Sequence, residues 1–274
     1  MIQVTAPVEA PETKPKSTFD GIELPTDYMV FDIETGPLPD DVLAKLCPPM
    51  ESKPHPGKFD PESVKFGNTK DQTKIAEKLR NARHTHDGEV AKYEGGQKIA
   101  EAEHFNKFRG DAALSAATGH VVAIGVAAHG CVDILASAME EETLNLWWTV
   151  VKKCLKRNMP MVGFNTKGFD LPFLVRRSWI HNVPIPSGVR VGRYWSEQFI
   201  DLMEVWNQGD RGYVKLDMLC AAFGLPGKVT EVDGVEVSGE TFHILWETNR
   251  KVAEEYLRGD ILLPCELARR MQVV

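Results

Sequence analysis

Paired cysteines, long apolar runs and an excess of positive charge are all missing from this 274-residue sequence. Its five cysteines are dispersed without a Cys-x-x-Cys pair, which argues against a zinc site and favours reduced thiols in a cytoplasm. The longest apolar run, residues 121–128, is too short to span a bilayer, and the N-terminus has no cationic apolar leader. We therefore expect a cytoplasmic protein with no membrane partner.

The formal net charge of −7 does not provide the broad basic face that duplex-binding proteins usually present. This net charge is compatible with an enzyme that binds a few nucleotides through metal ions and local contacts. The content of 43% hydrophobic and 26% charged residues is that of an ordinary globular protein. Global charge is therefore weak evidence about function in either direction.

The most informative stretch is residues 28–35, an apolar run interrupted by two acids and ended by a Gly-Pro pair. Its Tyr, Val, Phe and Ile residues favour a strand. Because side chains alternate along a strand, Asp32 and Glu34 point the same way and their apolar neighbours point into a core. Two carboxylates about 4 Å apart repel by roughly 4 kcal/mol at an effective dielectric near 20, so the pair needs a proton, a basic side chain or a hard cation. An ion-paired strand end explains this pair equally well on its own.

The chain divides by composition into a tail, a main domain and an insertion. Residues 1–26 are rich in Pro, Glu, Thr and Lys and predict a flexible tail, and residues 27–274 predict one domain. Residues 47–112 are polar, with 12 Lys and Arg against 11 Asp and Glu, and predict an insertion. Residues 69–108 have helical composition, so we expect one or two helices there. The insertion is either a substrate clamp or, more simply, a solvated excursion.

The remaining pattern predicts an α/β fold on a mixed sheet. Residues 120–127 and 132–135 read as a hairpin, and the spacing at residues 137–140 suggests a capping box before an amphipathic helix. That helix carries Trp147 and Trp148, which we interpret as core residues rather than a stacking platform. A short buried strand follows at residues 161–164.

Further acids follow later in the chain. Asp170 sits near a predicted helix N-terminus, where an acid is often only a cap. The last helix is expected to start from Thr248 as N-cap, and it places Tyr256 and Asp260 four residues apart on one largely buried face. A buried Asp needs a partner, yet neither residue 256 nor residue 264 supplies a Lys or Arg. Pro264 should kink or interrupt the helix.

Two other places near these acids attract attention. Asp201 ends a predicted strand and could be a fifth acid of the site, although a structural role explains it as well. Residues 229–237 read as a hairpin around an Asp-Gly turn, which could edge a substrate groove. Lys228 precedes it and could meet a phosphate, but a solvated side chain is the simpler interpretation.

Taken together, these segments resemble the DEDD superfamily of 3′–5′ exonucleases. Three motifs in chain order carry the resemblance: Asp32-x-Glu34-Thr35 with Leu38, Asn165-x-x-x-Phe169-Asp170, and Tyr256-x-x-x-Asp260. Each motif is weak alone, and their order at the expected strand and helix positions makes the signal specific. The resemblance spans about residues 28–270 and implies an RNase H-like exonuclease fold, with a central mixed sheet flanked by helices.

The third motif also resembles one branch of the superfamily. That branch (DEDDy) has Tyr four residues before the last Asp, here Tyr256, whereas the other has His at the position of Glu255. Residues 215–220 and 224–228 also resemble segments of stand-alone exonucleases that are related to the family-B DNA polymerase proofreading domain. No polymerase domain is expected, because the chain ends soon after the third motif.

The resemblance implies a catalytic set of Asp32, Glu34, Asp170, Tyr256 and Asp260. All-oxygen ligation by the four acids suits two Mg²⁺ or Mn²⁺ ions, about 4 Å apart, in a two-metal-ion mechanism. Asp32 would bridge the ions, Glu34 and Asp260 would lie on the nucleophile side, and Asp170 would act through water. Tyr256, whose ordinary pKa is near 10, would orient the attacking water rather than act as a base.

The resemblance also implies substrate contacts at Thr35, Leu38, Asn165 and Phe169. The expected substrate is the 3′ end of single-stranded DNA, released as nucleoside 5′-monophosphates. An exoribonuclease is the alternative within the class, since four acids read phosphate rather than sugar. A non-catalytic nucleic-acid or partner-binding module is the alternative from another class. The sequence does not identify any replication or repair partner.

Overall fold

The computed structural model describes residues 22–274 except positions 53, 193 and 211, so most of the expected tail at residues 1–26 lies outside the described residues. The chain forms two compact units: one runs up to Gly36 and resumes over Leu114–Val274, and the other is Pro37–Ala113. Among the described residues, no helix is both long and apolar enough to cross a membrane.

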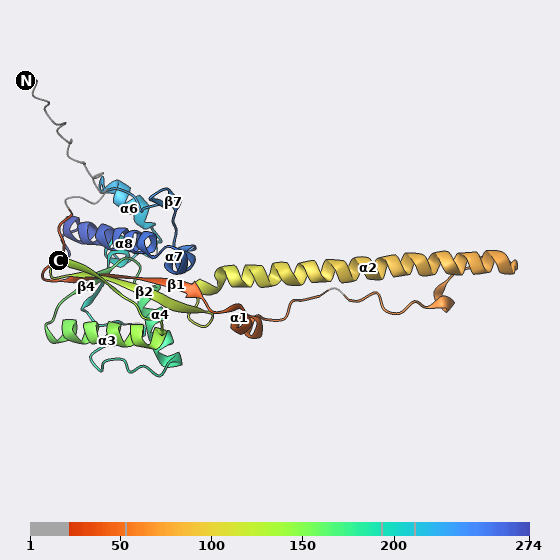
Figure 1. Ribbon diagram of the computed structural model, residues 1–274, viewed down its shortest axis with the longest axis horizontal. Coiled ribbons are helices and arrows are strands. Elements are labelled where there is room, and N and C mark those ends of the chain that lie inside the picture. Colours follow the sequence, from red (N-terminus) through yellow and green to blue (C-terminus); the bar gives the residue numbers. More distant parts are fainter. Residues whose placement is uncertain (1–21, 53, 193, 211) are drawn as a thin grey trace, which may run out of the picture. The chain divides into compact units, whose positions relative to one another are not determined.

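The first unit is built on a five-stranded sheet in the order β3-β2-β1-β4-β5 (Figure 1). Its strands are β1 (Met29–Pro37), β2 (Gly119–Ala128), β3 (Cys131–Leu135), β4 (Met161–Gly163) and β5 (Phe199–Asp201). β1 pairs in parallel with β4, and β4 with β5, whereas β2 and β3 are antiparallel. His129 (φ 52°) and Gly130 (φ 73°) make the tight turn between β2 and β3. The predicted mixed sheet and hairpin are confirmed.

Helices cover both faces of this sheet (Figure 1). On one face lie α3 (Glu140–Lys156) and α4 (Asp170–Ile180), whose apolar side chains pack with Phe31 and Trp147. On the other face lies α8 (Arg250–Arg270), which packs with Val30. Phe31 and Val30 thus enter opposite cores, as strand alternation requires. The other elements are α5 (Leu202–Asn207), α6 (Leu216–Ala222), β6 (Glu231–Val232), β7 (Val235–Glu236) and α7 (Phe242–Thr248).

Two expectations about helix ends are wrong. Thr248 is the last residue of α7, and α8 starts after Asn249. The φ of −147° at Asn249 is not helical, so this residue separates the two helices. The expected capping box does not form, because the N-cap of α3 is Met139 and the hydroxyl of Ser137 bonds Glu142 instead. Pro264 does not interrupt α8. At both helix ends the hydroxyl that was expected to cap the helix bonds another partner, Glu142 for Ser137 and the Ile244 carbonyl oxygen for Thr248.

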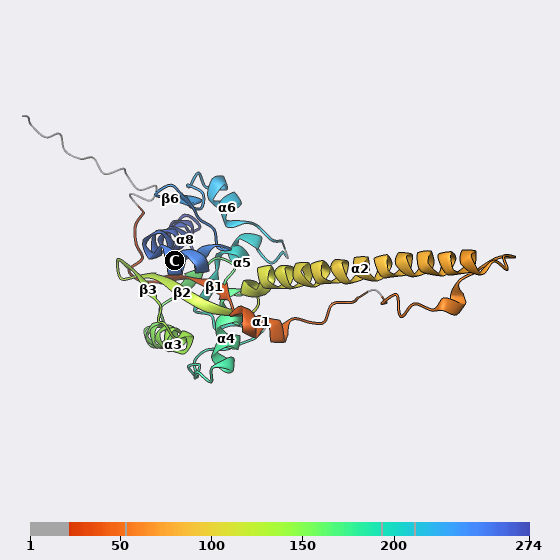
Figure 2. The same cartoon turned by 45° about the vertical axis from the view of Figure 1, so that its right-hand side comes forward.

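The second unit contains α1 (Asp40–Leu46), the short 3₁₀ helix η1 (Pro61–Ser63) and the 40-residue helix α2 (Gln72–Asp111), followed by η2 (Ala112–Leu114) at its edge. Figure 2 shows α2 as one continuous helix, so the helical composition of residues 69–108 was interpreted correctly. No residue of α2 is buried. The preceding segment runs back along it, with the rings of His55 and Tyr93 5.0 Å apart and the Pro48 carbonyl oxygen 2.9 Å from His104 Nε2.

Candidate active site

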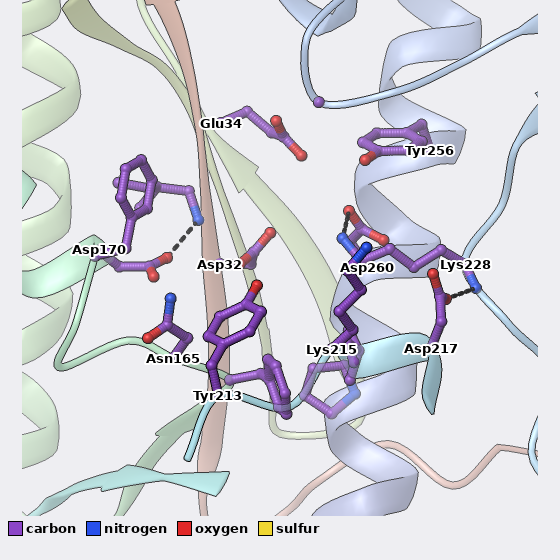
Figure 3. A pocket seen from close by; sticks show the side chains of 16 residues that line it. Asp32, Glu34, Asn165, Asp170, Tyr213, Lys215, Asp217, Lys228, Tyr256 and Asp260 are labelled. Carbon is purple, nitrogen blue, oxygen red and sulfur yellow. Dashed lines mark hydrogen bonds and ion pairs between the residues drawn. The ribbon is translucent and has the colours of Figure 1, made fainter. Parts of the chain in front are cut away.

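A cavity of about 340 Å³ opens where β1 faces α8 (Figure 3). Along β1, Asp32 and Glu34 point into this cavity, whereas Phe31 is buried in the core on the opposite face of the sheet. The strand alternation expected from the sequence therefore holds. The other lining residues are Ile33, Phe164, Asn165, Phe169, Asp170, Tyr213, Lys215, Leu216, Asp217, Lys228, Gly239, Tyr256, Asp260 and Pro264.

Three carboxylates meet at one end of the cavity. One oxygen each from Asp32, Glu34 and Asp260 lies within 4.8 Å of the other two. Glu34 is 6% exposed and Asp260 is 2% exposed, so neither charge is well hydrated. Oδ1 of Asp260 is buried and has no hydrogen-bond partner among the described residues. An all-oxygen set with an unpaired buried oxygen fits a hard divalent cation.

Asp170 lies across the same cavity but outside this group of three (Figure 3). It is the first residue of α4, as expected from its place near a helix N-terminus. Its Oδ1 accepts the backbone N–H of Ile33 at 3.1 Å, which ties α4 to β1 directly between the two acids of that strand. Hydrogen bonding thus fixes the carboxylate relative to Asp32 and Glu34.

The cavity strongly disfavours ionised carboxylates. Burial raises the pKa values of Asp32 and Glu34 well above their ordinary range, and the neighbouring acids raise them further. Burial also raises the pKa of Asp170 to about 7, although the Ile33 N–H opposes this shift. Burial raises the pKa of Asp260 against the opposing effect of Lys228. Without an added cation, burial and mutual repulsion therefore favour the protonated forms of these acids.

Lys228 supplies one cation, which sequence reasoning missed. Its Nζ donates to Asp260 Oδ2 at 2.9 Å, and its backbone N–H donates to Asp217 Oδ1 at 2.7 Å (Figure 3). Burial lowers the pKa of Lys228, but the charges of Asp260 and Asp32 more than offset this and hold it above its ordinary value. The interpretation of a solvated lysine is therefore wrong. The sequence signal for this pair was a buried Asp260 with no Lys or Arg four residues before or after it.

Tyr256 lies beside Asp260 and Glu34 and is only 4% exposed. Burial, followed by the charges of Asp260 and Glu34, raises the pKa of Tyr256 far above its ordinary value, so the phenol is neutral. Gly239 lines the cavity near both groups. A Cβ there would lie 3.8 Å from Tyr256 Oη and 3.9 Å from Glu34 Oε2, so the absence of a side chain leaves this space open.

The four expected substrate contacts divide into two pairs. Asn165 and Phe169 line the cavity, whereas Thr35 and Leu38 are not among its lining residues. Asn165 adopts φ 57°, a left-handed conformation that Asn tolerates. Its backbone N–H donates to Asp201 Oδ1 at 2.9 Å, and that of Lys167 donates to Asp201 Oδ2 at 2.9 Å. Asp201 therefore shapes the loop through its hydrogen bonds and does not line the cavity.

The loop between α5 and α6 adds residues that sequence reasoning did not select. Tyr213 and Lys215 both line the cavity, and the Tyr213 side chain is 71% exposed (Figure 3). Neither residue has a spacing that marks it, because both come from an irregular loop. The structure thus defines an α/β domain with an acidic, cation-fitting cavity at the end of a buried strand.

Comparison with known proteins identifies the family. Residues 116–263, just over half of the chain, match the family described as predicted 3′–5′ exonuclease related to the exonuclease domain of PolB, and the chain belongs to this family. The matched segment contains Asp170, Tyr256 and Asp260, whereas Asp32 and Glu34 precede it. A search of the curated proteins gave no match.

Among solved structures, the chain is similar to the family B DNA polymerase from the hyperthermophilic archaeon Pyrobaculum calidifontis. The two are 19% identical with a TM-score of 0.46, over 58% of this chain and 22% of the polymerase. The chain therefore matches less than a quarter of that protein's length. The expected RNase H-like α/β fold, with a five-stranded mixed sheet flanked by helices, is confirmed by the architecture and the family.

Membership of this family supports an exonuclease activity, which is a hydrolysis of nucleic acid. Exonuclease domains of this kind use divalent metals, and the acidic group of Asp32, Glu34 and Asp260 suits such ions.

Proposed function

We propose that this protein is a metal-dependent 3′–5′ exonuclease that removes nucleotides from the 3′ end of single-stranded DNA. The observation that carries the proposal is the convergence of Asp32, Glu34 and Asp260, with Asp170 in the same cavity, in a chain of an exonuclease family. We further propose that it is of the Tyr type, with Tyr256 as the phenol of the third motif.

In this proposal the four acids hold two Mg²⁺ or Mn²⁺ ions. Burial raises the pKa values of all four acids, and Oδ1 of Asp260 has no partner among the described residues, which supports a cation-binding role. Bound there, the ions would lower the pKa of the attacking water and stabilise the charge that develops on the phosphodiester oxygens.

The side chains have separate tasks in the reaction. Tyr256 keeps its proton on Oη, since its pKa is raised, and orients the attacking water through a hydrogen bond. Lys228 holds Asp260 in place through the Nζ–Oδ2 contact. Asn165 and Phe169 contact the substrate from the opposite wall. Water oxygen bonds to phosphorus as the P–O3′ bond breaks, and the freed 3′ oxygen takes a proton. The product is a nucleoside 5′-monophosphate.

We also propose that residues 47–112 are an insertion into an exonuclease domain that spans residues 27–274. The separate compactness of Pro37–Ala113 and the absence of buried residues from α2 support this division. The tail proposed for residues 1–26 completes the domain organisation.

The test is a time course on 5′-labelled single-stranded DNA and on RNA of the same sequence, with Mg²⁺, Mn²⁺ or EDTA. We expect a metal-dependent ladder that shortens the DNA from its 3′ end. A ladder on RNA alone would replace the DNA proposal with an exoribonuclease. No ladder on either strand, despite Mn²⁺ binding measured by calorimetry, would favour a non-catalytic binding module.

A matched pair of variants tests the site. Asp32→Asn removes a carboxylate from the group of three, whereas Asp217→Asn changes an exposed cavity-lining acid outside it. We expect Asp32→Asn to lower the rate by more than about 100-fold, above the loss typical of an outer-shell partner, and Asp217→Asn to keep most activity. Equal rates for Asp32→Asn and the parent chain would overturn the carboxylate mechanism.

A further inference from the structure

We propose that Tyr213 positions the substrate by stacking its ring on a nucleobase of an unpaired strand. The inference rests on the exonuclease function proposed above and names one contact by which the cavity holds single-stranded nucleic acid. Tyr213 belongs to the loop between α5 and α6 and lines the cavity beside Asn165 and Lys215 (Figure 3).

The charges of the cavity do not account for affinity toward a polyanion. Its floor carries Asp32, Glu34, Asp170 and Asp260, and the chain has a formal net charge of −7. Lys228 is already paired with Asp260, so among the described lining residues Lys215 is the one cation without an ion pair, against five acids. Stacking on aromatic side chains is the other general source of affinity for single strands, and it tolerates any base because every base has a π-face.

Four aromatic rings line the cavity, and three of them are engaged. Phe164 packs against the core on the α8 side, and Phe169 contacts Phe173 with ring centroids 5.6 Å apart. Tyr256 is 4% exposed. Tyr213 is 71% exposed and, among the residues that the structure describes, makes no hydrogen bond, ion pair or ring contact. Its faces are therefore available to a ligand.

The backbone next to Tyr213 is held even though its ring is exposed. Gln208 (φ 49°) and Gly209 (φ 93°) turn the chain sharply after α5. The Asn207 side chain donates to the Gly212 carbonyl oxygen, directly before Tyr213, and the Asp210 N–H donates to the Asn207 carbonyl oxygen at 2.9 Å. A rigid aromatic ring on a fixed backbone loses little conformational entropy when it binds.

Such a contact requires an unpaired base. Inside a duplex both faces of a base are covered by its neighbours in the stack, so Tyr213 gains nothing from paired DNA. DNA and RNA bases present the same kind of face, so the contact favours single strands without choosing the sugar. Tyr213 would thereby contribute to strand preference, while the carboxylates perform the chemistry.

The experiment measures equilibrium binding of a fluorescent single-stranded DNA by anisotropy. All proteins carry Asp32→Asn and are measured in EDTA, so that the strand stays intact. We expect Tyr213→Ala to weaken binding about 5- to 150-fold, the range for loss of one base–aromatic stack, and Tyr213→Phe to stay within about twofold. The matched control is Tyr194→Ala, which removes a ring of the same 71% exposure outside the cavity lining and should leave affinity unchanged.

A second measurement identifies the partner base. One abasic site is moved through the last six nucleotides of the strand, and each strand is titrated with both Tyr213 and Tyr213→Ala proteins. At one position we expect the abasic site to weaken binding to the Tyr213 protein but not to weaken binding to Tyr213→Ala any further, because both changes remove the same stack.

The outcomes separate the two proposals. Equal affinity of the Tyr213 and Tyr213→Ala proteins, in a chain that degrades the strand, would overturn the stacking and leave the exonuclease standing. Additive losses at every abasic position would overturn it as well. No binding and no cleavage of any strand by the parent chain would overturn both proposals.

Discussion

Asp170→Asn tests whether the carboxylate group strains the metal-free protein. The side chain is 3% exposed, and burial raises its pKa to about 7. Asn occupies almost the same volume and keeps an oxygen that can accept the Ile33 N–H, which Asp170 accepts at 3.1 Å. The substitution therefore removes the charge and preserves the contact.

The sign of the effect follows from proton linkage. The ordinary pKa of Asp is about 3.9, so between about pH 4 and pH 7 the folded chain keeps a proton that the unfolded chain has released. The free energy of unfolding therefore falls as pH rises through this window. At about 1.36 kcal/mol per pH unit, the loss reaches about 4 kcal/mol by pH 8. The amide introduced by Asp170→Asn does not titrate, so the variant avoids this loss.

We expect Asp170→Asn to match the parent protein near pH 4 and to exceed its stability by up to about 4 kcal/mol at pH 8 in EDTA. Urea unfolding followed by circular dichroism from pH 4 to pH 8 measures the difference. Asp133→Asn, an exposed acid on β3, is the control and should show no such trend. Saturating Mn²⁺ should narrow the gap, because it stabilises the parent protein more.

Two results would refute this reasoning. One is a stability difference that is the same at pH 4 and pH 8, which would show that Asp170 does not carry a raised pKa. The other is a less stable Asp170→Asn protein at pH 8 in EDTA, which would show that the ionised carboxylate is favourably solvated or paired.

Three further predictions concern other parts of the chain. Tyr256→Phe should slow hydrolysis about 10- to 100-fold in steady-state assays while the Mn²⁺ affinity, measured by calorimetry, stays within about twofold. Arg177→Met should destabilise the fold by about 3–5 kcal/mol in urea unfolding, because it removes the guanidinium that pairs with the largely buried Glu140 carboxylate; Glu140→Gln in the same chain should recover most of the loss. Burial alone would raise the pKa of Glu140, but hydrogen bonds from Arg177 hold it below its ordinary value, so this contribution exists above about pH 4 and disappears in more acid solution. His104 Nε2 and the Pro48 carbonyl oxygen are 2.9 Å apart, so a short Gly-Ser linker can replace residues 49–103. This replacement should leave the melting temperature of the remaining chain nearly unchanged. Loss of cooperative unfolding would contradict the proposal that these residues belong to an insertion.

The parts of the fold that sequence predicted are those governed by local periodicity. Alternation over β1 separated Asp32 and Glu34 from Phe31, and the structure keeps that separation. The hairpin of β2 and β3 was readable because strand propensity and Gly130 agree at the turn. Trp147 was assigned to the core from helical spacing, and it is fully buried.

The parts that sequence missed depend on tertiary contacts. α7 packs against α8, and the boundary between them at Thr248 and Asn249 does not follow the capping preference of Thr. The Glu140 carboxylate bonds Arg177 and the Val121 N–H, so it is not available for a capping box. Tyr213 comes from an irregular loop that has no period to read. A local sequence preference, such as a capping preference, is overridden where a buried polar group forms a stronger hydrogen bond with a residue elsewhere in the fold.

Lys228 shows both how far sequence reasoning reaches and what it adds to the proposed chemistry. The sequence indicated that a buried Asp260 needs a partner, but the lysine that meets it is 32 residues away in the chain. The cavity lining carries five carboxylates and two ammonium groups, which leave three negative charges when all of them are ionised. One divalent ion would still leave a negative site that repels a phosphodiester, whereas two leave a single positive charge, which the phosphodiester neutralises. The charge balance of the described side chains therefore favours two cations over one in the proposed exonuclease.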